Sequence, residues 1–347
     1  MIELLENRRL LSVVSDTSTL VPAGFSPQQI SQAYGFNNIV YTNFKGQPVI
    51  GNGAGQTIAV VSAFRDPTVA GDLRTFDKQF GLSNGRGGFA LSVVMPQGRP
   101  AENPDWAQET ALDVEWAHAM APAAKILLVE TKTDSAADLF KGVDYARKHR
   151  GVTVVSMSWG WDTAPAAVDY QDILTTPAKH VGGLGKGDGV TFIEAGSDDG
   201  VSTAFPDSSV PVISVGGTTL TLDADGQYQS ETPLPESNAS ASVAYEADPN
   251  ATGFAIYDST PDAGVQGWQI GGGTSAGAPQ WAALFAIADQ LRAVQGRHSL
   301  DGPTQSLPAL TTTLPAADFH SIPGGGANMG RGSPIANKLV IDLIGIT

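Results

Sequence analysis

Apolar runs alternate with helix-period segments along most of the chain. Short runs rich in Val, Ile and Ala predict buried strands. The segments between them repeat apolar residues every three or four positions, which is typical of helices. Strands are expected at Thr57 to Val61, Phe89 to Met95, Lys125 to Val129, Thr153 to Ser156, Val190 to Ala195 and Val210 to Val215. Helices are expected at Thr68 to Phe80, Asp105 to Met120, Ser135 to His149 and Thr274 to Arg297.

This alternation predicts an α/β fold with a doubly wound, mostly parallel sheet flanked by helices. Gly and Pro are spread through the chain, and no linker, repeat or low-complexity block divides it. We therefore expect a single domain over residues 25–347, behind a leader or disordered N-terminus at residues 1–24. In such sheets, functional groups gather where strands end and the following helices begin.

Composition narrows the classes of function. The chain has 35 acidic and 20 basic residues, for a net charge of −15. A nucleic-acid partner is not expected, because phosphate binding needs clustered Lys and Arg. Cysteine is absent, which excludes disulfides and thiolate chemistry. No apolar run is long enough for a membrane span. The segment from Glu6 to Ser12 resembles a short leader of exported bacterial proteins, so a secreted or extracytoplasmic location is expected. We also expect a monomer.

The run from Gly271 to Pro279 is the strongest candidate for catalysis. Three glycines and Thr274 lead to Ser275, and Pro279 follows in what reads as the first turn of a helix. Glycines let a ligand approach the backbone closely, and free N–H groups at a helix start suit an oxyanion. This pattern favours Ser275 as the nucleophile of a peptide-bond hydrolase. The alternative is an ordinary Ser or Thr cap of a helix.

A serine nucleophile needs a base, and the sequence offers two carboxylates in place of a histidine. None of the five histidines lies in a His-Gly-Thr setting like that of a subtilisin. Glu109 and Asp113 are four residues apart on a predicted helix and share one face. Neighbouring carboxylates tend to share a proton, which raises one pKa and suits a base. The alternative is a solvated acidic face.

Taken together, these motifs resemble the sedolisin family of serine-carboxyl peptidases, which have a subtilisin-like fold. They are the Glu109 to Glu115 helix, the run Ser156 to Gly160 and the Gly-Thr-Ser-x-x-x-Pro run at Ser275. The resemblance implies a Ser275, Glu109, Asp113 triad, with Asp198 as the oxyanion donor. It also implies an extended peptide or protein substrate and an acidic pH optimum. Counting forward from Gly196 would select Ser197 instead, but the spacing to Pro206 favours Asp198. The residues implied to bind substrate are Ser158, Trp159, Gly160 and Gly273.

The chain departs from the family pattern in three places. The family holds one Ca²⁺ near the C-terminus, and the matching ligands would come from Ile322, Gly324, Gly326 and Asn328. Both acidic ligands are missing, so we expect a weak or absent site. The segment between Leu220 and Ala247 is short, and Ser62 stands where relatives often have an acidic residue. A catalytically impaired member of the family, acting as a peptide-binding or structural protein, is therefore the second hypothesis.

Overall fold

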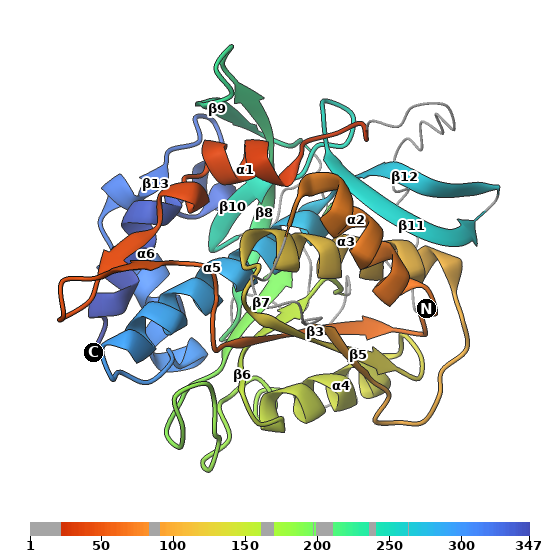
Figure 1. The fold of residues 1–347 in the computed structure, drawn as a ribbon, viewed down its shortest axis with the longest axis horizontal. Coiled ribbons are helices and arrows are strands. Elements are labelled where there is room, and N and C mark those ends of the chain that lie inside the picture. Colours follow the sequence, from red (N-terminus) through yellow and green to blue (C-terminus); the bar gives the residue numbers. More distant parts are fainter. Residues whose placement is uncertain are drawn as a thin grey trace.

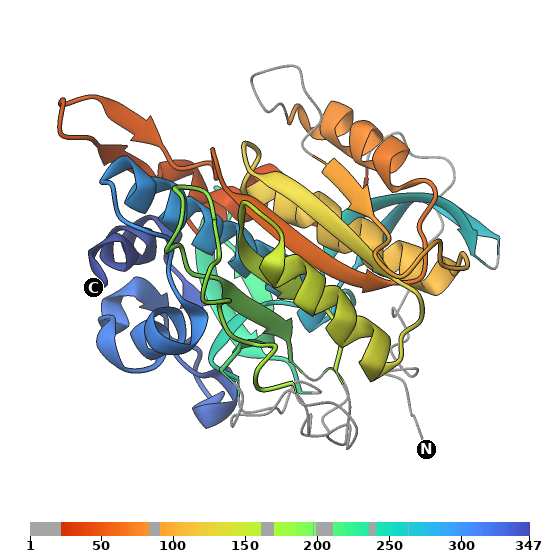
Figure 2. The same cartoon turned by 90° about the horizontal axis from the view of Figure 1, so that it is seen from below.

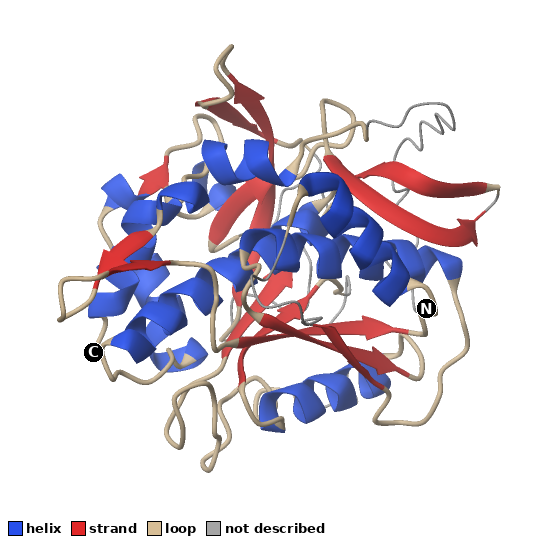
Figure 3. Cartoon of the chain, in the orientation of Figure 1, coloured by secondary structure: helices blue, strands red, loops and turns tan. Residues whose placement is uncertain are grey.

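A single large sheet organises the molecule (Figure 1, Figure 3). The computed structural model describes residues 22–82, 91–160, 170–196, 198, 211–235, 241–262 and 264–347. Within these residues, eight strands form a sheet of order β10-β8-β7-β6-β3-β5-β4, with β9 pairing with β8. All neighbouring strands are parallel except β8 and β9. The bounds are β3 Thr57–Ala63, β4 Leu91–Val94, β5 Lys125–Thr131, β6 Val152–Met157, β7 Thr191–Ala195, β8 Ile213–Leu222, β9 Tyr228–Pro233 and β10 Val243–Glu246.

Helices cover both faces of this sheet, as the view from below shows (Figure 2). Helices α3 (Pro104–Met120) and α5 (Thr274–Val294) pack together over one face, and α4 (Ala136–Lys148) covers the other. Helix α2 (Val69–Phe80) lies against α3, and α6 (Ala336–Gly345) lies against α5. The predicted α/β fold with a mostly parallel, helix-flanked sheet is confirmed.

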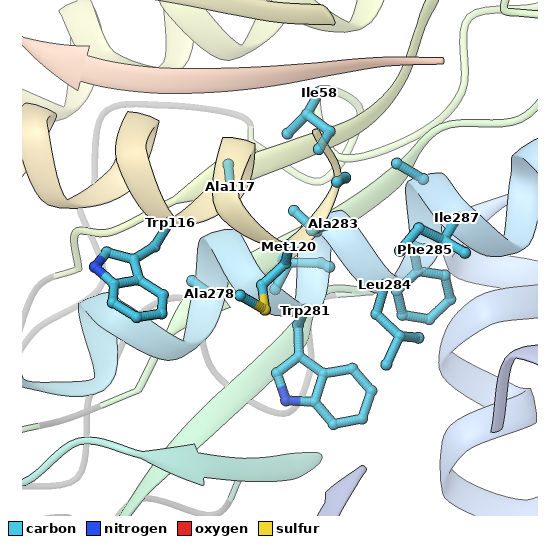
Figure 4. Packing of buried hydrophobic residues seen from close by; sticks show 14 of the residues in the cluster. Ile58, Trp116, Ala117, Met120, Ala278, Trp281, Ala283, Leu284, Phe285 and Ile287 are labelled. Carbon is cyan, nitrogen blue, oxygen red and sulfur yellow. The ribbon is translucent and has the colours of Figure 1, made fainter. Parts of the chain in front are cut away.

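The core forms where alternate strand residues meet these helices. On β3, Ile58 and Val60 belong to the cluster under α3 and α5, while Ala59 and Val61 face α4. Helix α5 is buried at every position from Thr274 to Arg292. Its Trp281 and Ala278 pack beside Met120 and Trp116 of α3 (Figure 4). The two helices that carry the candidate catalytic residues therefore belong to one rigid core.

Several smaller elements complete the chain. They are α1 (Pro27–Ala33), the hairpin of β1 (Val40–Thr42) and β2 (Pro48–Ile50), the hairpin of β11 (Phe254–Asp262) and β12 (Val265–Gly271), and the pair β13 (Phe319–His320) and β14 (Ser333–Pro334). Short helical turns lie at Phe36–Asn38, Gly302–Ser306, Ala309–Thr313, Ala316–Asp318 and Gly326–Met329. The hairpin β11–β12 matters most for function, because β12 runs directly into the start of α5.

The predicted elements lie close to the observed ones. The four predicted helices match α2, α3, α4 and α5 to within three residues at each end. The strand expected from residue 210 begins instead at Ile213 and continues to Leu222, because its second half pairs with β9. Residues 1–21 lie outside the described part, so the proposed leader stays a prediction. Among the described residues, no helix is both long and apolar enough to cross a membrane.

Candidate active site

Ser275 lies in the first turn of α5, two residues after the N-cap Gly273. Gly273 has φ +84°, a conformation that glycine adopts without strain. A Cβ at this position would lie 2.9 Å from Oδ2 of Asp198, so only glycine leaves room for that carboxyl group. The Gly273 N–H donates to the Ala247 carbonyl over 2.7 Å, which fixes the approach to the helix. Glycine is thus required beside the candidate nucleophile.

Asp198 is held against the same helix start. Its Oδ1 atom accepts the backbone N–H of Thr274 over 2.7 Å. The Thr274 hydroxyl donates to the carbonyl of Gly196 over 2.8 Å, at the end of β7. Thr274 therefore connects α5 to both sides of the turn that carries Asp198. Ser197, the alternative from the sequence, lies outside the described residues.

Asp113 lies beneath this helix start and is 1% exposed. Its Oδ1 atom accepts the hydroxyl of Ser158 over 2.6 Å. The same Ser158 oxygen lies 3.4 Å from the backbone carbonyl of Ser275. One hydroxyl group therefore connects Asp113 on α3 with the peptide unit of Ser275 on α5. Glu109 lies one helical turn before Asp113 on α3, and it is partly buried.

The run Ser158 to Gly160 follows β6 at the carboxyl edge of the sheet. The Trp159 indole N–H donates to the carbonyl of Val61 over 2.8 Å, and its ring meets Phe140 edge-on. Ser158 and Trp159 are only 4% and 3% exposed. The segment is therefore anchored by its own side chains, which leaves its backbone as the part suited to pairing with an extended peptide.

Ser62 lies under the other side of α3. Its hydroxyl lies 2.7 Å from that of Thr110, which donates to the Trp106 carbonyl over 2.7 Å. The Ser62 hydroxyl therefore donates to the Thr110 hydroxyl, since the Thr110 proton is already donated to the Trp106 carbonyl. Ser62 is paired in register with Glu130 on the neighbouring strand β5. Ser62 thus belongs to a buried hydroxyl pair, with the carboxyl group of Glu130 on the next strand.

The histidines are engaged elsewhere. His118 lies 3.2 Å from Asp77, and His298 lies 2.8 Å from Asp188. A His180 ring nitrogen lies 2.6 Å from the Val152 carbonyl oxygen. His320 stacks on Tyr228, and His149 contacts Tyr145. These contacts give each imidazole a structural setting, and the expectation that the base is a carboxyl group stays a prediction.

A cluster of buried carboxyl groups joins several elements near α3, and no motif in the sequence predicts it. The Asp66 N–H donates to Glu130 over 2.9 Å, and the Ser259 hydroxyl donates to Asp72 over 2.7 Å. Burial raises the pKa of Asp66 to about 6 and the pKa values of Glu130 and Asp258 to about 7. Desolvation favours the neutral form of each acid. The cluster fastens the hairpin β11–β12 to α2 and to the end of β3.

The proposed calcium loop has a poor set of ligands. The Ile322 carbonyl accepts the Gly325 N–H over 3.3 Å, and its side chain packs with Met329 and Ala244. Gly324 and Gly326 both have positive φ. The side chain of Asn328 lies outside the described structure. Within the described residues, no three His, Asp or Glu side chains gather as metal ligands. The residues present do not fit Ca²⁺, which takes carboxylate-rich sets of six to eight oxygens.

Comparison with known sequences identifies the family. The family model described as the subtilase family matches residues 105–300, which is more than half of the chain. The chain belongs to the subtilase family. The matched range begins in α3, before Glu109, and ends after α5, so it contains every candidate catalytic residue. No curated protein matches this subtilase.

Solved structures confirm the fold of the subtilase. A structure of Pseudomonas sedolisin, a serine-carboxyl proteinase in complex with pseudo-iodotyrostatin, matches with a TM-score of 0.68 at 19% identity. The match covers 93% of this chain and 98% of that one. The prenylagaramide maturation protease PagA matches with a TM-score of 0.51 at 15% identity, covering 82% of this chain and 93% of that one. The fold is therefore that of a subtilase-type serine protease.

Proposed function

We propose that this subtilase is a serine-carboxyl endopeptidase of the sedolisin type. Ser275 is the nucleophile, Glu109 is the general base, and Asp113 orients Glu109. The observation that carries the proposal is the hydrogen bond from Ser158 to Asp113, because it brings a buried carboxylate to the start of the nucleophile helix. A serine nucleophile needs a base, and in this proposal a carboxyl group takes the place of the usual histidine.

The reaction follows the usual logic of nucleophile, base and orienting acid. The Ser275 Oγ attacks the scissile carbonyl carbon while Glu109 takes its proton. Glu109 returns this proton to the leaving nitrogen, the C–N bond breaks, and an acyl-enzyme remains. Water then attacks the ester carbon with Glu109 again as base, and the peptide acid is released.

Asp198 completes the proposal as the oxyanion donor. With a proton on Oδ2, its Oδ1 stays free to accept the Thr274 N–H, as the geometry requires. The neutral acid then donates to the oxygen that becomes negative in the tetrahedral intermediate. This role needs a protonated carboxyl group, so activity is expected at acidic pH. Secretion into an acidic medium and action as a monomer remain predictions.

The second candidate is a peptide-binding protein without catalytic activity. It is favoured by the calcium loop, where the acidic ligands of the family are replaced by Ser321 and Asn328. A weakened loop at this end of the molecule would loosen the peptidase, but it would leave the backbone around Ser158 able to pair with a peptide.

A cleavage assay separates the two candidates. Mixed peptide substrates are incubated with wild type, Ser275→Ala and Glu109→Gln over about pH 3 to 7, the range in which carboxyl pairs titrate. The proposal expects acid-dependent cleavage that both substitutions abolish. Equal product from wild type and Ser275→Ala at every pH would exclude a serine peptidase. Cleavage that survives Glu109→Gln would exclude the carboxylate base.

A further inference from the structure

The side chain of Ser158 has a contact that substrate binding does not explain. The predicted role of this residue uses only its backbone. Its hydroxyl, however, donates to Asp113 over 2.6 Å, in a place where both residues are almost completely buried. Hydrogen bonds to a charged, buried acceptor are among the stronger ones in proteins. The side chain therefore acts on Asp113.

The second neighbour of this hydroxyl is the Ser275 carbonyl, at 3.4 Å. In a helix this carbonyl would accept the N–H four residues later, but that residue is Pro279, which has no N–H. Residue 279 of α5 therefore has no N–H to donate to the Ser275 carbonyl. Ser158 presents a hydroxyl at that point.

A serine hydroxyl has one proton and two acceptors to serve here. The shorter contact shows that the proton goes to Asp113. Oδ1 of Asp113 is then occupied by a donor, which favours its ionised form. In the proposed triad, the proton shared by the two carboxyl groups then lies on Oδ2 of Asp113 or on Glu109.

We propose that Ser158 is a positioning residue of the catalytic apparatus, whose hydroxyl holds Oδ1 of Asp113 and fixes this carboxyl group relative to the nucleophile. This inference rests on the proposed function. It gives the Ser158 side chain a role distinct from peptide binding by its backbone. It also explains why a hydroxyl-bearing residue is useful at a buried position, where alanine would pack as well.

Ser156 provides a matched control. It lies two residues earlier, on strand β6, and is completely buried. Its hydroxyl has no hydrogen-bond partner within the described part of the chain. Ser156→Ala and Ser158→Ala thus remove the same atom from neighbouring buried positions, and only the second removes a bond to Asp113.

The test compares both alanine variants, Ser158→Thr and Ser275→Ala in pH profiles of peptide cleavage. Ser158→Ala is expected to lower kcat about tenfold, as for loss of a hydrogen bond to a charged group. Its KM should stay unchanged, because the peptide meets only the backbone. The acidic limb of kcat/KM should move to higher pH, since the pKa of the Glu109–Asp113 pair rises without the donor. Ser158→Thr should restore both, and Ser156→Ala should match wild type.

A wild-type kcat and acidic limb in Ser158→Ala would overturn the proposal. If Ser158→Ala is unchanged and Ser275→Ala is inactive, the data support the proposed function and reject the role of Ser158. If Ser275→Ala retains full activity, the proposed function itself fails. A readout independent of activity is the ¹³C titration of the Asp113 carboxyl group. Its midpoint should rise in Ser158→Ala and not in Ser156→Ala, and equal midpoints would reject the inference.

Discussion

The N–H of Thr274 donates to Oδ1 of Asp198 over 2.7 Å, which commits one carboxyl oxygen to the start of α5. The other oxygen, Oδ2, lies against Gly273, at the place where a Cβ would approach it to 2.9 Å. The two oxygens of Asp198 thus have different surroundings. One can only accept, and the other lies beside the backbone that leads to Ser275.

This asymmetry predicts that an amide can replace the carboxyl group. In Asp198→Asn, the amide oxygen still accepts the Thr274 N–H and the amide nitrogen donates without needing a proton from solution. We expect substantial cleavage by Asp198→Asn, with activity extended toward neutral pH. Asp198→Ala should lose roughly 10²- to 10³-fold in kcat, the usual cost of removing an oxyanion donor. Steady-state kinetics across pH would check both, and equal loss in the two variants would contradict a donor role.

Thr274→Val should lower stability and activity by removing a side-chain hydrogen bond while keeping the backbone one. Valine keeps the backbone N–H for Asp198 but removes the hydroxyl bond to the Gly196 carbonyl. The expected cost is about 1 kcal/mol of unfolding free energy, together with a lower kcat as the turn carrying Asp198 loosens. Denaturant unfolding and cleavage assays measure the two effects, with Thr274→Ser as the control that keeps the hydroxyl. A fully active, fully stable Thr274→Val would show that this bond is dispensable.

The buried carboxyl cluster predicts that stability falls as pH rises. Below the pKa of the unfolded chain, near 4, these acids are neutral in both states. Above it, the unfolded chain releases protons that the folded protein retains on Asp66, Glu130 and Asp258, whose pKa values are about 6, 7 and 7. Stability is therefore lost from about pH 4 until the folded groups also ionise near pH 7. Burial raises the pKa of Glu115 in the same cluster well above its usual value, in the same direction.

Thermal unfolding at pH 4 and pH 7 measures this loss, and we expect Tm to be lower at pH 7 by roughly 5 °C or more. Burial raises the pKa of Glu130, the charge of nearby Arg65 lowers it in part, and His118 lies 3.2 Å from Asp77. Asp258→Asn should reduce the difference in Tm, because an amide does not titrate. The substitution also keeps the oxygen that accepts the Thr260 N–H. Asp225→Asn removes the same charge from an exposed turn and should change little. A Tm that does not fall between the two pH values would refute the prediction.

Calcium is expected to contribute little to stability. The loop from Ile322 offers backbone oxygens, and Ser321 and Asn328 stand where acidic ligands would be. Excess chelator should therefore leave Tm unchanged within experimental error. The double variant Ser321→Asp, Asn328→Asp supplies two carboxylates and should gain a calcium-dependent rise in Tm. A large drop in wild-type Tm on chelation would show that the native loop binds the ion.

The sequence predicted those parts of the fold that follow from local pattern. Helices α3 and α5 were predicted because they are long and regular, and the strands β3 and β5 because buried parallel strands read as continuous apolar runs. The hairpin β11–β12 was missed, since its polar residues are buried only by contacts with α2 and α3. Such burial depends on segments more than a hundred residues apart.

In the candidate site too, local motifs could be predicted from the sequence, and contacts between distant segments could not. Ser275, Glu109 and Asp113 stood out because each lies in a short motif with its own spacing. The Ser158 hydroxyl did not, because its partner is 45 residues away and the pairing depends on how α3 crosses the end of β6. The carboxyl cluster was equally hidden, since Asp66, Asp72, Glu130 and Asp258 come from four separate segments. Roles that arise from side chains meeting across elements need the three-dimensional structure.

Burial of α5 along nearly its whole length has a consequence for a protein that cuts peptides. An extended strand of about eight residues must be free of structure before a peptidase can cleave it, and such freedom begins at the least stable segments. Ser275 lies in the first turn of a helix that is buried from Thr274 to Arg292, so we expect this segment to open late. Exposed hairpins such as β1–β2, with Phe44 80% exposed at its tip, would be cut long before. Self-digestion would therefore trim the periphery first, while a nicked molecule still holds Ser275 in place.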